Sequence, residues 1–201
     1  KVDAKILNAK YFNLPQNRER LLLVAQRKDC AVSFSFPIGY DSGIRLKDIM
    51  LDGVLPPART PPFKLFKISQ TNEHRIIQCG VLIGRHYKQG NTVISPNGIS
   101  ECLTTKEGNW VLCPNGKIRP LNAHERFLAM GFDSEDFIAC KNAVVSNSEL
   151  IKQAGNSIAV TLLMAIFGKL FGVPWERQVF GNRYKTSAQM IKELPIFQNI
   201  K

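Results

Sequence analysis

Prolines and glycines are concentrated between residues 37 and 62 of this 201-residue chain, and the stretch separates parts of different character. Proline fixes one backbone dihedral and lacks an amide proton, while glycine adopts conformations closed to other residues. A segment rich in both does not continue a long helix or a central strand. Only one short amphipathic piece, Ile44–Leu51, interrupts it. We therefore expect a domain boundary here, marked by Pro37, Gly39, Gly43, Gly53, Pro56, Pro57, Pro61 and Pro62.

Two short apolar runs precede this boundary, at residues 2–9 and 20–27. Polar residues flank both runs, and a turn signal, Pro15-Gln16-Asn17, stands between them, so the pattern predicts two strands joined by a functional loop. The second run is apolar at five consecutive positions, 21–25. Uninterrupted apolar residues are typical of a strand covered on both faces in an α/β sheet.

Short β-like runs dominate the sequence from residue 76 to residue 113. Turn signals of the type Pro-Asn-Gly separate several of them. Short strands that alternate with such turns predict a small, mostly β module. The expected strands cover residues 76–83, 92–95, 102–105 and 110–113.

Helical signals then replace the β pattern. Asn122, followed three residues later by Glu125, resembles a capping box, and the apolar face that follows stops at Gly131. A second helix is expected from Ser157 to Phe171, because glycine and proline follow it directly. In the basic tail we expect one short helical turn at Met190–Leu194.

The chain carries 27 Lys and Arg residues against 16 Asp and Glu, and its formal net charge of +11 indicates a polyanionic partner. A hydrophobic content of 44% excludes a disordered basic tail, because such a chain buries enough surface to offset its ordering entropy. Residues 56–95 have a local net charge of +5 and interleaved aromatic residues. This region is either a nucleic-acid docking surface or an ordinary solvated face. Its basic residues are Arg59, Lys64, Lys67, Arg75, Arg85 and Lys88.

Other features exclude membrane and secreted classes. The longest apolar run, Ile158–Gly168, falls far short of the roughly 20 residues that a membrane-spanning helix needs. Residues 1–20 lack the continuous apolar core of a secretory signal. The five cysteines include no Cys-x-x-Cys pair, so we expect reduced thiols rather than a disulfide framework or a zinc site. Because the first residue is not Met, we expect a processed chain or part of a longer protein.

The segment Gln16-Asn17-Arg18-Glu19-Arg20 contains two arginines two residues apart. Side chains alternate across an extended strand, so Arg18 and Arg20 are expected to point the same way. Taken alone, they fit surface ion pairs at a strand start equally well. The segment resembles the Gln-x-Arg-x-Arg motif of the cytosine-C5 DNA methyltransferases. The resemblance implies two catalytic arginines: Arg20 donates to the carbonyl oxygen of a flipped cytosine, and Arg18 supports the active-site face.

Two later segments resemble further motifs of this family in the expected order. Residues 119–132 are similar to its next motif, a helix with an Arg-x-Leu start and a Met-Gly-Phe end. Residues 153–160 are similar to its last motif, Gln-x-Gly-Asn-Ser-Val-x-Val, in which Gly-Asn-Ser opens a helix beside S-adenosylmethionine. The resemblance makes Asn156 and Ser157 cofactor-binding candidates, while the residues by themselves also suit helix caps.

The region between these motifs resembles the target-recognition loops of the family. By this resemblance Gln89 fills the gap that the flipped base leaves in the stack; the alternative is a plain turn residue. Two positions depart from the family pattern, because Cys102 stands where Thr is usual and Leu128 stands where many members have Arg. The other DNA-binding candidates are Arg85, Lys88 and Thr104.

The family also needs a Cys in a Pro-Cys loop, a Glu in Glu-Asn-Val and a Phe-x-Gly-x-Gly loop, and none of these occurs in the chain. In the family all three precede Gln-x-Arg-x-Arg. The chain therefore resembles the C-terminal half of such an enzyme, and its own cysteines are poor candidates for the nucleophile.

The resemblance implies an α/β fold that combines the terminal strands and returning helix of a Rossmann-like methyltransferase sheet with a small, mostly β target-recognition domain. Residues 1–36 are expected to form the last strands of the catalytic domain. Residues 37–152 are expected to form the target-recognition domain with its hinge. Residues 153–201 would then supply the returning helix and a basic tail.

The expected function is the DNA-recognition and partial active-site half of a DNA (cytosine-5-)-methyltransferase of a restriction-modification system. Such an enzyme moves a methyl group from S-adenosyl-L-methionine to C5 of a flipped cytosine. The expected partners are double-stranded DNA and a second polypeptide, or a missing N-terminal part, that carries the nucleophile. No metal and no membrane are expected, and the expected location is the cytoplasm, with a prokaryotic or phage gene. The alternative is a non-catalytic DNA-binding remnant of a methylase.

Overall fold

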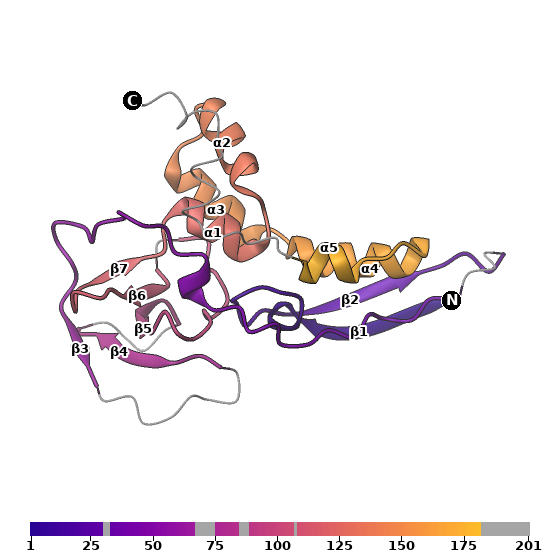
Figure 1. Ribbon diagram of the computed structural model, residues 1–201, viewed down its shortest axis with the longest axis horizontal. Helices are drawn as coiled ribbons and strands as arrows, with labels where there is room; N and C mark the ends of the chain where they lie inside the picture. The colour runs from indigo at the N-terminus through magenta and orange to yellow at the C-terminus, as the bar shows by residue number, and fades with distance from the viewer. Residues whose placement is uncertain (30–32, 67–74, 85–88, 107, 182–201) are drawn as a thin grey trace.

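The computed structural model describes residues 1–29, 33–66, 75–84, 89–106 and 108–181. A long two-stranded hairpin lies at one end of the molecule and a five-stranded sheet at the other; some helices lie above their junction and others run along the hairpin (Figure 1). One large hydrophobic core joins the hairpin base to the helices, and a separate small core lies in the five-stranded sheet. The fold is mixed α/β, as the sequence predicts.

The hairpin consists of β1 (Val2–Asn8) and β2 (Glu19–Ala25), which pair antiparallel with Ile6 opposite Leu21. Both strands lie where the apolar runs predict them. A 3-10 turn, Ala9–Tyr11, begins the loop between them. Because the loop leads back into β2 at Glu19, the motif arginines stand at the end of the hairpin where the loop joins the two strands, here called its base. The opposite end, at Val2 and Ala25, is here called its tip.

Only one face of this hairpin is covered. Leu7 and Val24 belong to the large core, together with side chains of α4 (Val160–Phe171), which runs along the hairpin (Figure 1). On the opposite face Leu21 is 63% exposed and Leu23 is 67% exposed. The expectation that β2 is covered on both faces is therefore wrong for this chain, because no described element packs on the outer face.

The five-stranded sheet has the order β3-β4-β5-β6-β7, antiparallel except for the parallel pair β5 and β6. Trp110, Val93 and Ile118 form its core with Cys79 and Leu82. Three of the four predicted runs contain strands, while the run at 102–105 contains none. The strands are β3 (Phe63–Leu65), β4 (Gln78–Leu82), β5 (Thr92–Ile94), β6 (Trp110–Leu112) and β7 (Ile118–Pro120).

Helix α1 (Ala123–Met130) begins and ends where its sequence signals predict. The Asn122 side chain accepts from the Glu125 amide, Glu125 completes the capping box, and Gly131 ends the helix in the left-handed conformation. Two further helices follow that the apolar pattern did not predict, α2 (Ser134–Asn142) and α3 (Asn147–Asn156).

The expected helix start at Ser157 is wrong. Asn156 is the last residue of α3, Ser157 is its C-cap, and α4 begins only at Val160. A signal for α3 was present, since the Ser146 side chain accepts from the amide of Glu149 three residues later. Met190–Leu194 lies outside the described residues, and before it the chain forms α5 (Glu176–Phe180).

Within the described ranges, no single helix has the length and apolar character to cross a membrane, and only the bent pair α3 and α4 passes by length and composition together.

A buried ion pair ties α1 to the sheet. Arg119 on β7 donates to Glu125 with both guanidinium nitrogens, at 2.7 and 2.6 Å, and the two side chains are 3% and 0% exposed. The same carboxylate accepts from the amides of Leu51 and Asn122. One carboxylate therefore holds the proline-rich segment, α1 and the last strand together.

We expect Glu125→Gln to lower the free energy of unfolding by about 3–5 kcal/mol, because it leaves the buried Arg119 charge without its partner. Chemical denaturation measures the change. The matched control is Glu149→Gln, which breaks an exposed pair with Lys152 and should cost at most about 1 kcal/mol. Equal losses in the two variants would contradict this role for Glu125.

Candidate functional site

Arg18 lies at the meeting point of three distant segments. Its side chain is 3% exposed, and Nη2 donates to the carbonyl oxygens of Gly155 and Ser157 at 3.0 and 2.7 Å. Nη1 donates to Cys102 Sγ at 3.1 Å. The segments that resemble the Gln-x-Arg-x-Arg and Gly-Asn-Ser motifs therefore touch through one guanidinium group.

The local fold explains this placement. Asn8 Oδ1 accepts from the backbone amides of Lys10 and Arg18, both at 3.1 Å, and so closes the loop at the base of the hairpin. Gln16 is fully buried; its Nε2 donates to the Ala129 carbonyl at 3.0 Å, and its Oε1 accepts from the Leu103 amide at 3.0 Å. Sequence reasoning named the two arginines but missed Gln16, although the same motif contains it.

Arg20 lies beside Arg18 but remains exposed. Its Nη2 contacts Cys102 Sγ at 3.5 Å, so both arginines reach the same sulfur, as their spacing in the strand predicts. Burial lowers the pKa of the Arg18 guanidinium, and the neighbouring Arg20 charge lowers it further, while Cys102 opposes the shift. Because Arg18 is buried and Arg20 is exposed, Arg20 is the member of the pair that an incoming group can reach.

The two cofactor candidates occupy the short break between α3 and α4. Asn156 is exposed, and its side chain has no hydrogen-bond partner in the part of the chain that the structure describes. The Ser157 hydroxyl donates to the Ile158 carbonyl. The first backbone N–H groups of a helix have no acceptors within the helix. At α4 no described side chain caps them.

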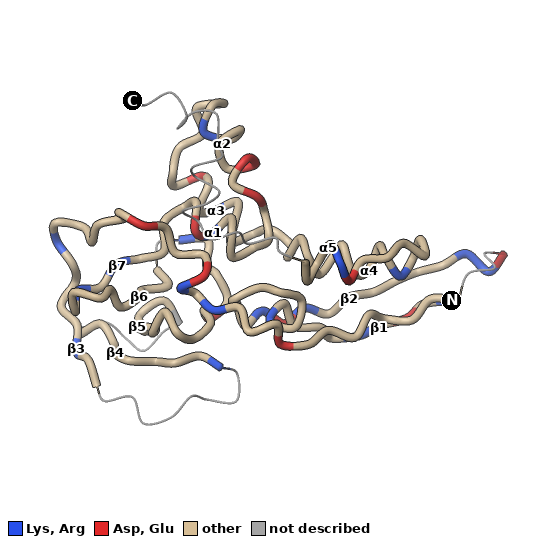
Figure 2. The backbone as a smooth tube through the Cα atoms, viewed as in Figure 1, with Lys and Arg blue, Asp and Glu red and all other residues tan. Residues whose placement is uncertain are grey.

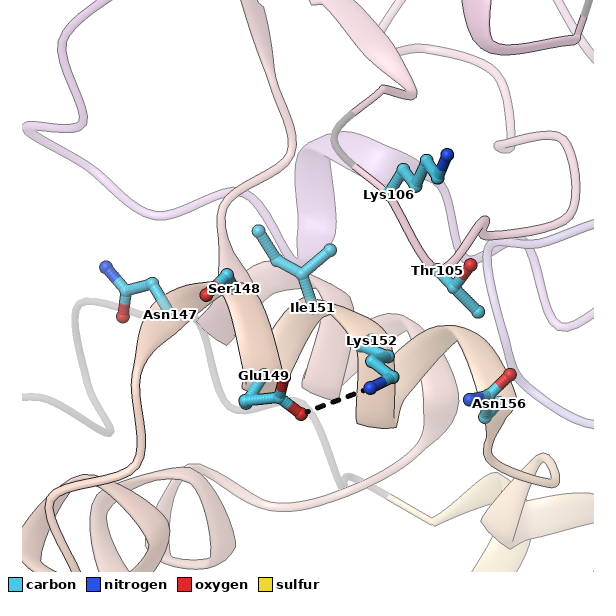
Figure 3. A pocket seen from close by; sticks show the side chains of 8 residues that line it. All are labelled: Thr105, Lys106, Asn147, Ser148, Glu149, Ile151, Lys152 and Asn156. Carbon is cyan, nitrogen blue, oxygen red and sulfur yellow. Dashed lines mark ion pairs between the residues drawn. The ribbon is translucent and has the colours of Figure 1, made fainter.

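An open cavity of about 740 Å³ adjoins Asn156 between α3 and the loop at residues 105–106 (Figure 3). Lys106 projects from the loop, and Lys152 on α3 pairs with Glu149 at 3.7 Å (Figure 3). Side chains of both signs of charge therefore line the cavity. Its lining residues are Thr105, Lys106, Asn147, Ser148, Glu149, Ile151, Lys152 and Asn156.

The predicted DNA-binding residues are only partly described. Arg85 and Lys88 lie outside the described residues. Gln89 begins a 3-10 turn, Gln89–Asn91, directly before β5. Thr104 is half-buried; its hydroxyl donates to the Lys106 carbonyl, so it shapes the loop beside Arg18 rather than standing free.

The basic region 56–95 is not uniformly a solvated face. Arg59 is exposed before β3, and Lys64 is exposed on β3 itself. Arg75 instead pairs with Asp41 at 3.0 Å and lies over the Tyr11 ring. Arg75 therefore has a structural partner and contributes less to a nucleic-acid surface than its sequence position suggests.

The described cysteines 79, 102, 113 and 140 form no disulfide, and the described residues contain no cluster of metal-ligating side chains. Burial raises the pKa of the Cys79 and Cys113 thiols, which disfavours the reactive thiolate. These findings agree with the expectation that neither is a nucleophile.

The sequence model described as C-5 cytosine-specific DNA methylase matches residues 1–172. The chain belongs to this family. It is 26% identical over 258 residues to the orphan methyltransferase M.SPBetaI of Bacillus phage SPbeta, which covers 85% of this chain and 58% of that protein. It is 27% identical over 174 residues to the type II methyltransferase M.HhaI of Haemophilus parahaemolyticus, which covers 81% of this chain and 51% of that protein.

Structural comparison gives the same fold. The Entamoeba histolytica methyltransferase EhMeth matches 86% of this chain and 53% of its own, with a TM-score of 0.55 and 11% identity. The chain thus spans about half the length of the relatives it matches. Enzymes of the family use S-adenosylmethionine as methyl donor.

We expect Gly155→Ala to destabilise the chain, although alanine normally stabilises a helix by about 1 kcal/mol relative to glycine. A Cβ at Gly155 would lie 2.5 Å from the Thr104 carbonyl oxygen, so the loop or α3 must move. Thermal unfolding measures the sign. The control is Gln153→Ala at an exposed position of α3, which should be neutral or stabilising. A higher Tm for Gly155→Ala would refute the close approach.

Proposed function

We propose that this chain is the DNA-recognition and partial active-site half of a DNA (cytosine-5-)-methyltransferase. The observation that carries the proposal is the convergence on Arg18, where three motif-bearing segments meet with an exposed Arg20 beside them. In this assignment residues 1–36 and 153–201 belong to the catalytic domain and residues 37–152 form the target-recognition domain with its hinge.

Arg20 donates a hydrogen bond to the carbonyl oxygen of a cytosine that has left the base stack. Attack at ring carbon 6 pushes electron density into the ring, and a permanently charged donor at that oxygen stabilises the transition state. Arg18 is held by two carbonyl oxygens and therefore keeps the active-site face in place. The support for this division is that only Arg20 of the pair is exposed.

The residues around the α3–α4 break fit one edge of a cofactor site. The exposed Asn156 side chain and the uncapped first turn of α4 offer hydrogen-bond donors to an amino-acid carboxylate. In the proposal Asn156 and Ser157 hold the amino-acid end of S-adenosylmethionine. When bound, this cofactor supplies the methyl group for carbon 5 of cytosine.

In this proposal the five-stranded sheet β3-β4-β5-β6-β7, here called the recognition sheet, binds duplex DNA. Exposed Arg59 and Lys64 support it, and Arg85, Lys88 and Gln89 remain predicted contacts, with Gln89 in the vacated stack. Thr104, in the loop beside Arg18, is a further predicted DNA contact. Phosphate contacts of this kind would give salt-dependent binding.

A second polypeptide, or an N-terminal part of a longer protein, supplies the nucleophile. The hairpin supports this partner: Val2, Ile6, Leu21 and Leu23 are each at least 63% exposed, and the register places them on one face. Between Arg20 and the tip, β2 carries no charge (Figure 2). Among described strands β2 pairs only with β1, so its other edge is open to a further strand.

We expect Arg20→Ala to abolish methyl transfer while duplex affinity changes by less than about twofold, because Arg20 acts on the base rather than on phosphates. The assay mixes the chain with a polypeptide containing Pro-Cys and Glu-Asn-Val and follows labelled methyl groups from S-adenosylmethionine into duplex DNA. The chain alone should transfer none. The control is Arg27→Ala, an exposed arginine near the hairpin tip that pairs with Asp29. If Arg20→Ala turns over as fast as the wild type, Arg20 does not act on the base.

We expect Leu23→Lys to weaken association with that polypeptide about tenfold or more, since burying a leucine side chain contributes about 1.5–3 kcal/mol. The unfolding free energy of the chain itself should not change, because the side chain is already 67% exposed. Leu55→Lys is the control, at a position that is 81% exposed and lies outside the hairpin strands. If Leu23→Lys and the wild type associate equally, the open face is not the interface.

A chain that binds duplex DNA but gains no activity from any such polypeptide is the non-catalytic remnant.

A further inference from the structure

Arg126 is a fully buried cation on α1, with 0% of its surface exposed. Its Nε donates to the Leu121 carbonyl oxygen at 3.1 Å, close to its own helix. The other two nitrogens reach a different part of the chain: Nη1 donates to the Thr104 carbonyl at 3.0 Å and Nη2 to the Gly108 carbonyl at 2.8 Å. One side chain therefore binds three backbone carbonyl groups.

Residues 102–106, here called the linking segment, depend on such contacts. The segment contains no helix or strand, so side chains must satisfy its buried backbone groups. Gln16 accepts from the Leu103 amide, Arg126 donates to the Thr104 carbonyl, and Gly155 lies against Thr104. The sequence pattern predicted a strand here, and these bonds from distant residues explain why none forms.

The linking segment runs from the site arginines to the recognition sheet. At its start, Cys102 Sγ accepts from Arg18 and contacts Arg20. Beyond its end, Gly108 and Asn109 lead directly into β6 at Trp110. This segment is therefore one route by which a shift of the sheet reaches the two arginines.

We propose that Arg126 is a positioning residue that couples the recognition sheet to the active-site arginines, a role that rests on the proposed methyltransferase function. By fixing Thr104 and Gly108 it sets where Cys102 meets Arg18 and Arg20. A planar guanidinium presents donors in a fixed fork, whereas a lysine has a single nitrogen and cannot span the same carbonyls. On α1, Arg126 supplies the guanidinium, whereas Leu128 packs in the core.

The first test needs only the full chain. In Arg126→Met, amide hydrogen exchange at Leu103, whose amide donates to Gln16, should speed up at least tenfold, and Arg126→Lys should restore part of the protection. The control is Leu128→Ala, on the same helix, which removes a core side chain that cannot hydrogen-bond to the linking segment. Unchanged exchange in Arg126→Met, or equal acceleration in Leu128→Ala, would overturn the role of Arg126 as the anchor of the linking segment.

The second test uses the reconstituted enzyme and the same methyl-transfer assay. Arg126→Met should lower kcat about 100-fold, since small misplacements of catalytic groups cost this much, while the KM for duplex DNA stays within about threefold. Leu128→Ala, measured well below its Tm, should keep kcat within twofold. Equal kcat losses in the two variants, or a loss confined to KM, would make Arg126 merely structural.

The two tests separate failure of the anchor from failure of the proposed function. If the wild-type mixture transfers no methyl groups, the methyltransferase proposal fails, and the exchange experiment still decides the anchor. If Arg126→Met does not fold, Arg126→Gln replaces it in both tests, because its amide keeps one donor for the Gly108 carbonyl. Wild-type exchange and wild-type kcat in Arg126→Gln would then overturn the proposal.

Discussion

The buried guanidinium of Arg18 is the interaction on which the rest of the site depends. A charge removed from water needs acceptors close by, and here they are the carbonyl oxygens of Gly155 and Ser157 and the sulfur of Cys102. The chain must therefore bring the α3–α4 break and the linking segment to the base of the hairpin. Arg20, two residues further along the chain in β2, then stands exposed at the surface that these segments create.

The hairpin that carries these arginines is only half enclosed. One face packs under α4 and joins the large core, whereas the other leaves Leu21 and Leu23 in water. Exposed contiguous apolar surface of this kind is unfavourable in an isolated chain and is typical of an interface. The proposed methyl-transfer site and the proposed partner surface thus lie on the same two strands, so binding of the partner would complete the sheet and the active site together.

The five-stranded sheet has its own small core, and it joins the remainder through apolar contacts of Ile94 and Val111 as well as through polar contacts. Gln16, Arg126 and the Arg119–Glu125 pair are all buried, and each binds backbone or charge across the junction between α1 and its neighbours. Fully satisfied polar networks of this kind specify one arrangement more sharply than apolar packing does. This explains how a sheet with few core side chains is held in a definite orientation to the hairpin.

The sequence by itself determined the elements whose signals are local. The two hairpin strands, the capping box of α1, the glycine stops after α1 and α4, and the adjacency of Arg18 and Arg20 all follow from neighbouring residues, as did the family. Only the tertiary structure decided that residues 102–106 form no strand, that Asn156 ends a helix instead of opening one, and that one face of β2 stays open. The reason is physical: buried Arg18, Gln16 and Arg126 bind backbone groups far away in the chain, and a buried Arg or Gln selects its partners only once the segments meet.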